Sequence, residues 1–159
     1  MNKFSSSMCL MGAFIGTFSC MNTSHANEIV VDLNNHTLTY TDKILDVRLE
    51  YPIVAPRKDV RYIYGQERHF SVKRINIWPN WQRDDGKRYP GGHPSNPLGY
   101  GRITFLNQRG GLRPCAIHGK GRIADMGKNL SGCCVRITDK NIRELMMYTT
   151  NDTSIELIY

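Results

Sequence analysis

The chain has 159 residues, a length that favours one domain because a second core of useful size would not fit. Hydrophobic residues make up 40% and charged residues 22%, ordinary values for a globular protein, so neither a disordered chain nor a fibre is expected. The 21 Lys and Arg outnumber the 14 Asp and Glu and give a net charge of +7. This charge favours an acidic partner, whether nucleic acid, anionic lipid or another anionic polymer, although a solvated basic surface without a partner is the alternative.

Residues 1–26 have the pattern of a secretory signal peptide. Lys3 is the only charge before Glu28, and residues 8–18 form an apolar stretch of suitable length. The segment ends in Ser24-His25-Ala26, with small residues at the two positions that a signal peptidase inspects. Ser and Gly interrupt the stretch, which is too short for a stable membrane span. We therefore expect export to the periplasm and a mature domain of residues 27–159.

Two other interpretations of this segment remain open, a buried N-terminal helix and a lipoprotein anchor at Cys20. The anchor is disfavoured because Thr17-Phe18-Ser19 lacks the usual aliphatic residue of a lipobox. Cleavage would leave three cysteines, Cys115, Cys133 and Cys134. Exported proteins normally pair their cysteines, but three cannot all pair with one another, so one is a candidate nucleophile or an intermolecular partner.

Alternation of apolar and polar residues predicts a mostly β fold. Expected strands cover residues 28–33, 38–40, 44–51, 70–77, 102–106, 116–118, 134–137 and 155–159. One helix is expected, with Asp139 as its N-cap and an apolar face of Ile142, Leu145 and Met146. We predict a single curved β-sheet or sandwich with one short packed helix near the C-terminus. Residues 82–100, rich in Gly, Pro and charge, are expected to form a long functional surface loop.

Chemically reactive side chains concentrate in residues 116–136. His118 follows one short strand and Cys134 opens the next, sixteen positions later, so two neighbouring strand ends can bring them together. A cysteine nucleophile needs a base or a cationic neighbour to form its thiolate near neutral pH, and histidine has a suitable pKa. Taken alone, His118 is better explained as a strand-end histidine bonded to backbone, and Cys134 as a structural thiol or half of a disulfide.

Other chemistries find less support in the sequence. A zinc site is disfavoured because adjacent cysteines are not the usual spaced ligand pair, and His36, His69 and His93 follow no ligand pattern. No cofactor is therefore expected. Nucleic acid is disfavoured as a partner because no zinc module, helix-turn-helix or RNA-binding strand signature is present.

The reactive residues resemble the signature of the L,D-transpeptidase catalytic domain family. In that signature a His-Gly pair is followed, after a loop, by Ser/Thr-x-Gly-Cys-x-Arg. His118 and Gly119 match the pair. Further along, the matching residues are Ser131 for the Ser, Gly132 for the variable position, Cys134 for the nucleophile and Arg136 for the Arg.

Further segments extend this resemblance over essentially all of residues 28–159. Val31-Asp32-Leu33 and Leu38-Thr39-Tyr40 are similar to the family's opening hairpin. Trp78-Pro79-Asn80-Trp81 resembles its Pro-Trp segment, and Asn96-Pro97-Leu98-Gly99 its element upstream of the His. The expected helix and the closing strand fall where the family has them. The ordered set is far more specific than the cysteine motif alone.

The resemblance implies an enzyme of cell-wall biogenesis and cell shape that acts on the stem peptides of peptidoglycan. Cys134 would attack the L-centre carbonyl of diaminopimelate and expel the terminal D-Ala, leaving a thioester. His118 would carry the proton, and the Gly119 carbonyl would orient its ring. An amine of a second stem, of a wall-linked protein or of a free D-amino acid would then accept the acyl group, whereas water would make the enzyme an L,D-carboxypeptidase.

The resemblance also implies roles for the residues around this pair. The backbone amides of Cys133 and Cys134 would stabilise the oxyanion, while Ser131 and Gly132 would shape the turn. Substrate contacts are expected from Arg136, Asn96, Trp81 and Tyr100, with Trp78 and Tyr89 as further residues that could line the loop. A structural ion pair of Arg136 and ordinary packing of the aromatic rings are the alternatives.

Two departures from the family pattern leave other functions open. Cys133 stands where the family has a Gly before the nucleophile, and it could pair with Cys115, or with Cys134 and block it. Ala55-Pro56-Arg57-Lys58 replaces the usual Thr-Pro-x-Gly turn, so the substrate groove on that side would differ. The open alternatives are a hydrolase that trims stems or releases wall-attached protein, and a non-catalytic wall-binding module with Cys133 and Cys134 oxidised.

Overall fold

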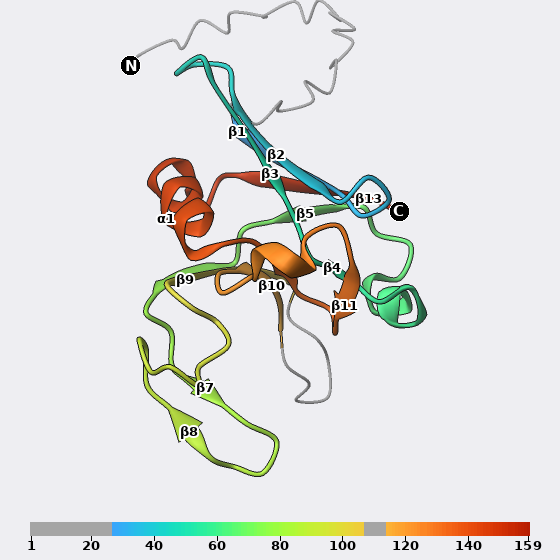
Figure 1. The fold of residues 1–159 in the computed structure, drawn as a ribbon. Helices are drawn as coiled ribbons and strands as arrows, with labels where there is room; N and C mark the ends of the chain where they lie inside the picture. Colours follow the sequence, from blue (N-terminus) through green and yellow to red (C-terminus); the bar gives the residue numbers. More distant parts are fainter. Residues whose placement is uncertain (1–26, 107–113) are drawn as a thin grey trace, which may run out of the picture.

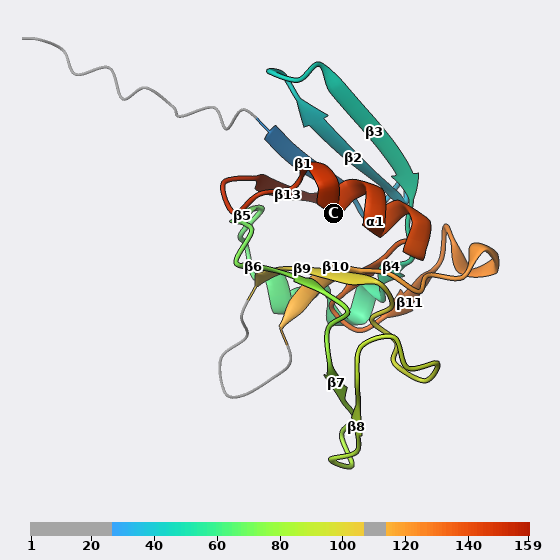
Figure 2. The same cartoon turned by 90° about the vertical axis from the view of Figure 1, so that its left-hand side faces the viewer.

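The computed structural model describes residues 27–106 and 114–159, so the expected signal peptide, with Cys20, lies outside the described residues. Two main sheets form separate layers (Figures 1 and 2). The first has the strand order β3-β2-β1-β13-β5, with β1 Asn27–Asp32, β2 Thr37–Asp42, β3 Val47–Pro52, β5 His69–Ser71 and β13 Ser154–Ile158. The second has the order β12-β10-β9-β6, with β6 Arg74–Ile77, β9 Gly101–Leu106, β10 Cys115–His118 and β12 Val135–Arg136. The predicted mostly β sandwich is therefore confirmed.

The first sheet joins the two ends of the described chain. Strands β1 and β13 run in parallel side by side, with Ile29 opposite Ile155 and Val31 opposite Leu157. All four side chains are fully buried, because alternate residues of both strands face the second layer. This packing joins the two ends of the described chain and places β13 between β1 and β5 (Figure 1).

Strand β3 begins later than the sequence pattern predicts, at Val47 rather than at Ile44. The carboxylate of Asp42 accepts hydrogen bonds from the amides of Ile44 and Leu45 at 2.8 and 2.9 Å. These bonds hold the two residues in the turn, where both side chains are exposed. The expectation of a strand from residue 44 was wrong because apolar character alone does not reveal a side-chain bond to the turn.

The single α-helix of the described residues, α1 (Asp139–Tyr148), packs on the second sheet. Its N-cap is Thr138, whose Oγ1 accepts a bond from the Asn141 amide at 3.2 Å, so the expectation of Asp139 as N-cap is corrected by one residue. Ile142 and Leu145 are fully buried, as the predicted apolar face requires. The described residues also contain two 3-10 helices that the sequence analysis did not foresee, η1 (Lys58–Tyr64) and η2 (Ile123–Asp125).

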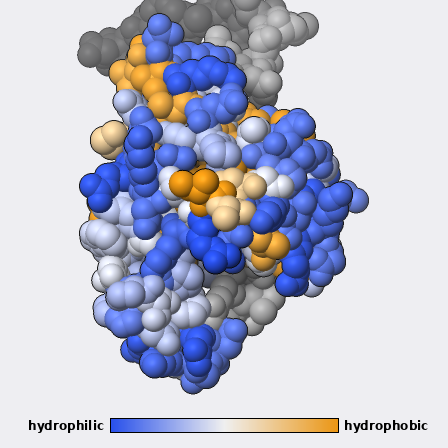
Figure 3. All heavy atoms as spheres, viewed as in Figure 1, coloured by the Kyte–Doolittle hydropathy of each residue, from blue (hydrophilic) through white to orange (hydrophobic). Residues whose placement is uncertain are grey.

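The segment expected as a long loop contains a short hairpin of β7 (Trp81–Gln82) and β8 (Arg88–Tyr89), at the bottom of Figure 1. The Trp81 and Tyr89 rings lie opposite each other with centroids 5.4 Å apart, a cross-strand pair that stabilises the two strands. On the face drawn in Figure 3, hydrophobic surface is divided into small patches, and the bottom of the view is mainly hydrophilic. Within the described ranges, no helix has the length and apolar character needed to cross a membrane.

A second short ladder pairs β4 (Ala55–Pro56) with β11 (Asn129–Ser131). The amide of Arg57 donates to the carbonyl of Ser131 at 3.0 Å. The segment that departs from the family's Thr-Pro-x-Gly turn therefore supports the chain immediately before the two adjacent cysteines.

Candidate active site

Strand register brings the cysteine and histidine of the motif to one face of the second sheet. Strands β10 and β12 are parallel, with Ile117 opposite Val135 and His118 opposite Arg136. Ile117 and Val135 are fully buried between the layers. Because side chains alternate along a strand, His118 and Arg136 project from the other face, and Cys134, two residues before Arg136, shares it.

A cavity of about 960 Å³ opens on this face. His118, Cys134 and Arg136 line it, together with Trp81 of the hairpin and Arg102 of β9. The volume lies in the range of small-molecule and peptide-binding clefts. The site is therefore large enough for a substrate with several residues beside the sulfur atom.

His118 is held as a neutral imidazole with one defined tautomer. Its Nδ1 lies 2.9 Å from the Gly119 carbonyl oxygen, which can only accept, so Nδ1 carries the hydrogen and Nε2 the lone pair. The side chain is 4% exposed. Burial, reinforced by the positive charges of Arg136 and Arg102, lowers the pKa of His118 to about 4. At neutral pH the ring can therefore accept a proton through Nε2.

Asp139 fixes the turn that carries the Gly119 carbonyl. Its Oδ1 accepts hydrogen bonds from the amides of Tyr100 and Lys120 at 2.8 and 3.0 Å. The carboxylate packs so closely on Gly119 that a Cβ atom there would collide with Oδ1. Asp139 was expected only as a helix cap, and its contact with the His-Gly pair arises because α1 packs against β10.

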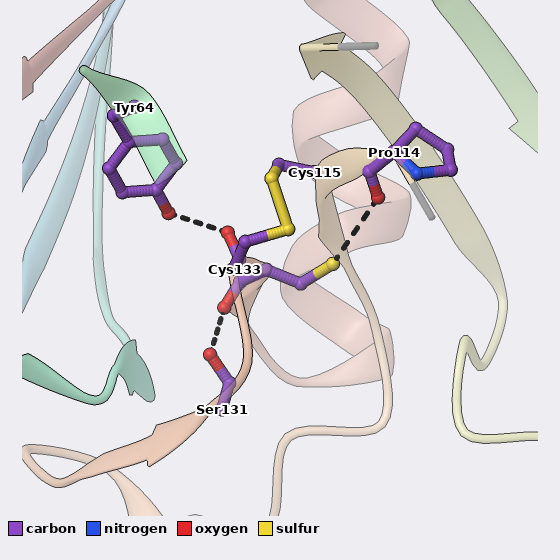
Figure 4. The surroundings of a disulfide bond; sticks show 6 residues. Tyr64, Pro114, Cys115, Ser131 and Cys133 are labelled. Atoms are coloured by element: carbon purple, nitrogen blue, oxygen red, sulfur yellow. Dashed lines mark hydrogen bonds between the residues drawn. A yellow bond between two sulfur atoms is a disulfide. The ribbon is translucent and has the colours of Figure 1, made fainter. Parts of the chain in front are cut away.

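The disulfide of the site joins Cys115 and Cys133, with Cα atoms 5.2 Å apart (Figure 4). Of the pairings that the sequence left open, this is the one that leaves Cys134 as a thiol. The Cys134 Sγ lies 3.8 Å from the Pro114 carbonyl oxygen and is half-buried at the cavity. The alternative in which Cys133 and Cys134 are oxidised together is contradicted by this pairing.

Hydrogen bonds from two side chains hold the peptide groups around Cys134 (Figure 4). The Tyr64 hydroxyl donates to the Cys133 carbonyl at 2.5 Å, and the Ser131 hydroxyl donates to the Cys134 carbonyl. Ser131 is fully buried, so its hydroxyl holds the turn. Gly132 has open space around its Cα and lines the cavity. No local sequence pattern marks Tyr64, because it lies in η1, far from the motif along the chain.

The residues expected to contact substrate divide into two groups. Arg136 and Trp81 line the cavity, whereas Asn96 and Tyr100 do not. Asn96 is 1% exposed, and its amide donates to the Pro79 carbonyl at 2.8 Å while its Oδ1 accepts from the Leu98 amide at 3.0 Å. The expectation of a substrate contact is corrected for Asn96, because its polar atoms hold the loop together.

The Tyr100 ring contacts two protein side chains. It lies 5.1 Å from the ring of Trp78, and the Arg143 guanidinium stacks 4.3 Å from its centroid. Tyr100 and Trp78 therefore pack against each other outside the cavity, and the substrate role expected for Tyr100 is corrected in the same way. Tyr89 pairs with Trp81 and His93 in the hairpin.

Arg102 is a cavity residue that the sequence analysis did not single out. It lies opposite His118 in the antiparallel pairing of β9 and β10. Its Nη2 donates to the Asn76 Oδ1 at 3.2 Å. No motif marks Arg102, and only the strand register places it beside the histidine.

The site combines a thiol and a neutral, oriented imidazole on one sheet face beside a cleft, an arrangement suited to nucleophilic acyl transfer. The comparison with protein families identifies the domain. The model of the YkuD family, described as the L,D-transpeptidase catalytic domain, matches residues 26–157. The chain therefore belongs to this family.

Solved structures share the fold at low sequence identity. The NMR structure of the catalytic domain of the Enterococcus faecium (E. faecium) L,D-transpeptidase is 19% identical with a TM-score of 0.59, covering 86% of this chain and 99% of that one. The same domain acylated by ertapenem is 18% identical with a TM-score of 0.59, covering 84% and 98%. L,D-transpeptidase 3 from Mycobacterium tuberculosis is 12% identical with a TM-score of 0.62, covering 84% and 61%. No curated protein sequence matches the chain.

Proposed function

We propose that this domain is a cysteine-dependent L,D-transpeptidase that acts on the stem peptides of peptidoglycan. Membership of the family supports the reaction class. The observation that carries the proposal is the Gly119-bonded, neutral His118 on the sheet face that also presents Cys134. A base with its lone pair on Nε2 is what a thiol nucleophile requires.

The proposed reaction proceeds through an acyl-enzyme. Cys134 Sγ attacks the L-centre carbonyl of diaminopimelate in a donor tetrapeptide, and His118 Nε2 takes the thiol proton. The C–N bond to the terminal D-Ala breaks, and His118 returns the proton to the leaving amine. A second amine then attacks the thioester and forms a new amide, loses a proton to His118, and the sulfur leaves as the thiol. General acid-base catalysis of this kind contributes about 10²–10⁴-fold to the rate.

The turn at the nucleophile supplies the proposed oxyanion donors. A trans peptide directs its N–H away from its C=O, so the Tyr64 bond to the Cys133 carbonyl orients the Cys134 amide away from Tyr64. Backbone amides of Cys133 and Cys134 would then face the developing negative charge on the carbonyl oxygen. The loss of one such donor costs about 10²–10³-fold in enzymes of this type.

Mass spectrometry of a disaccharide-tetrapeptide incubated with residues 27–159 tests the proposal. We expect a 3–3 cross-linked dimer or exchange of D-Ala for another D-amino acid, with both products absent in Cys134→Ala. His118→Ala should lower the rate by at least 10²-fold, whereas His69→Ala, which removes an exposed histidine of β5, should not. A tripeptide without dimer would identify an L,D-carboxypeptidase instead. No conversion by protein with an intact Cys134 thiol would refute catalysis on this substrate and favour wall binding.

Acylation by a carbapenem gives a second test that needs no acceptor. The E. faecium domain of the same fold has been solved acylated by ertapenem. We expect one ertapenem adduct per chain in the intact mass of residues 27–159 and none in Cys134→Ser. An adduct that persists in the variant would place the reactive nucleophile elsewhere.

We also propose that the domain works outside the cytoplasm, in the periplasm. The Cys115–Cys133 disulfide supports this, because disulfides persist mainly in oxidising compartments. Fractionation of cells that express the full chain should recover a processed form beginning after Ala26 in the periplasmic fraction. Recovery of a lipidated form beginning at Cys20 would favour a membrane anchor.

A further inference from the structure

Arg102 and Arg136 flank His118 on the cavity face. Arg102 on β9 lies opposite His118 on β10, and His118 lies opposite Arg136 on β12. All three side chains line the cavity. The sheet therefore presents a row in which one guanidinium stands on each side of the imidazole.

Neither arginine forms an ion pair with a carboxylate of the described residues. Asp125, whose pKa is lowered mainly by Arg122 and also by the charge of Arg136, forms its ion pairs with Arg122 and Lys128. The Nε atoms of Arg102 and Arg136 are buried without a hydrogen-bond partner. Arg102 has one neutral partner, the Asn76 amide oxygen. A desolvated cation without an anion is unfavourable, so an anion bound in the cavity would stabilise the two guanidinium groups.

Electrostatics supports the same conclusion for Arg102. Burial lowers its pKa, and Arg74 adds repulsion, while the opposing influence comes from Cys134. Cys134 lines the same cavity, so this opposing charge is that of its thiolate form, and a neutral thiol leaves the half-buried guanidinium without it.

The strand order places Arg136 on the side of the attacked carbonyl and Arg102 on the side of the leaving amine. Across the sheet, β12 carries Arg136 and is directly preceded by Cys134, β10 carries His118, and β9 carries Arg102. The attacked carbonyl must lie at Cys134, and the leaving amine must lie within hydrogen-bond reach of His118. The carboxylate of a leaving amino acid is two bonds beyond that amine, so a substrate that continues in the same direction brings it to Arg102.

We propose that Arg102, oriented by Asn76, binds the C-terminal carboxylate of the leaving residue and thereby selects stems that end one residue after the scissile bond. The inference rests on the proposed function, which supplies the donor. A planar guanidinium forms two parallel hydrogen bonds to a carboxylate. A carboxamide or an additional residue at this position removes the charge and leaves the buried cation without its anion.

The test compares two donors within each enzyme preparation, a tetrapeptide stem with a free C-terminal carboxylate and the same stem with a C-terminal carboxamide. For the wild type we expect kcat/KM to favour the acid by about 10–100-fold, the range of a charge-assisted hydrogen bond. Arg102→Gln should reduce this ratio to about 3 or less, and Arg102→Lys should keep part of it. Lys43→Gln, which removes an exposed cation of the turn between β2 and β3, should keep the wild-type ratio. Both donors are assayed with the same enzyme preparation, so partial unfolding of a variant lowers both rates by the same factor and leaves their ratio unchanged.

Two results would overturn the inference. One is a wild-type acid-to-amide ratio near 1, and the other is an Arg102→Gln variant that retains the wild-type ratio. The inference would also be overturned if an Arg102 variant changed only the pH dependence of Cys134 alkylation, because Arg102 would then act on the thiol and not on the substrate carboxylate.

Binding separates this inference from the proposed reaction. Calorimetry with the Cys134→Ala protein measures the affinity for the acid and the amide without turnover. If the wild type converts no donor but Cys134→Ala prefers the acid through Arg102, the proposed reaction fails and the inference holds. If turnover occurs without discrimination, only the inference fails.

Discussion

The hydroxyl of Tyr64, in the 3-10 helix η1, donates a 2.5 Å hydrogen bond to the carbonyl of Cys133, the residue before the proposed nucleophile. Tyr64 is 3% exposed, and its ring packs on Phe105 with centroids 6.2 Å apart. A residue of the core therefore determines the direction of the peptide group that joins Cys133 to Cys134. Burial raises the pKa of the Tyr64 hydroxyl, so it remains a donor throughout the physiological range.

We predict that Tyr64→Phe lowers the free energy of unfolding by about 1–3 kcal/mol, because the buried Cys133 carbonyl loses its donor. The rate kcat should fall about tenfold or more with little change in KM, since the oxyanion donors move relative to the carbonyl. Urea titration and steady-state kinetics measure the two effects. Tyr62→Phe is the matched control, because Tyr62 lies in the same 3-10 helix and is 77% exposed. Equal effects of the two variants would contradict this role of Tyr64.

Protonation of His118 should set the pH at which the activity falls on the acid side of its pH profile. The pKa of His118 is lowered to about 4 by burial and the neighbouring arginines. The imidazole therefore stays neutral, and competent as a base, at pH values where an ordinary histidine is protonated. We expect the acid limb of kcat/KM, which reports the free enzyme, to fall through pH about 4 instead of about 6.5. A midpoint near 6.5 would show that His118 is exposed to water or paired with the thiolate.

The same shift predicts a pH dependence of stability. In the unfolded chain His118 binds a proton below pH about 6.5, whereas the folded protein takes it up only near pH 4. The unfolded state therefore binds more protons between these values, and the free energy of unfolding decreases as the pH falls, by roughly 3 kcal/mol in all. His118→Gln should lose this component, while the carboxylates contribute equally to both proteins. Urea midpoints of the pair between pH 7 and pH 4 measure the difference, and parallel curves would disprove the shift.

The disulfide should be structural and separate from the reactive thiol. Cys115 and Cys133 are 18 positions apart, and a loop of this size stabilises a fold by about 3 kcal/mol. We expect Cys115→Ala/Cys133→Ala to lower the free energy of unfolding by that amount and to make stability insensitive to dithiothreitol. Thiol titration of folded, non-reduced residues 27–159 should detect one reactive group, lost in Cys134→Ala. Two or more thiols before reduction would show that the disulfide is not formed.

Gly119 should tolerate no side chain. A Cβ atom would collide with Asp139 Oδ1 and approach Ile142 Cγ2 to 3.1 Å. We predict that Gly119→Ala costs roughly 1–3 kcal/mol of stability and displaces the carbonyl that orients His118. Gly132→Ala is the control for stability, because nothing lies within 4 Å of a Cβ atom there. Thermal unfolding of both variants separates the two, and an unperturbed Gly119→Ala melting curve would refute the close packing.

Much of this protein follows from local sequence. Alternation of apolar residues predicted the strands because one face of each sheet is buried, as Ile29 and Val31 of β1 illustrate. The helix was predicted from the spacing of Ile142 and Leu145. The spacing of His118 and Cys134 indicated a shared site, since both residues stand at the ends of short neighbouring strands.

Other features arise from contacts between distant parts of the chain, which no local pattern encodes. Asn96 and Tyr100 were expected to contact the substrate. Instead, the polar atoms of Asn96 form hydrogen bonds within the surrounding loop, and the ring of Tyr100 stacks on Arg143 of the helix. Thr138 replaced Asp139 as the N-cap because the Asp139 carboxylate bonds the Tyr100 and Lys120 amides instead. In each case a tertiary hydrogen bond or stacking contact decided what the side chain does.

The sequence by itself determined the mostly β architecture and the residues of the reactive motif, because burial periodicity and motif spacing are properties of short stretches of chain. Only the tertiary structure decided which cysteine Cys133 pairs with, that Tyr64 and Asp139 hold the peptides around Cys134 and His118, and that Arg102 stands beside the histidine. These relationships depend on strand register and on the packing of η1 and α1. Both are set by the packing of the whole core, so they become visible only when the chain is folded.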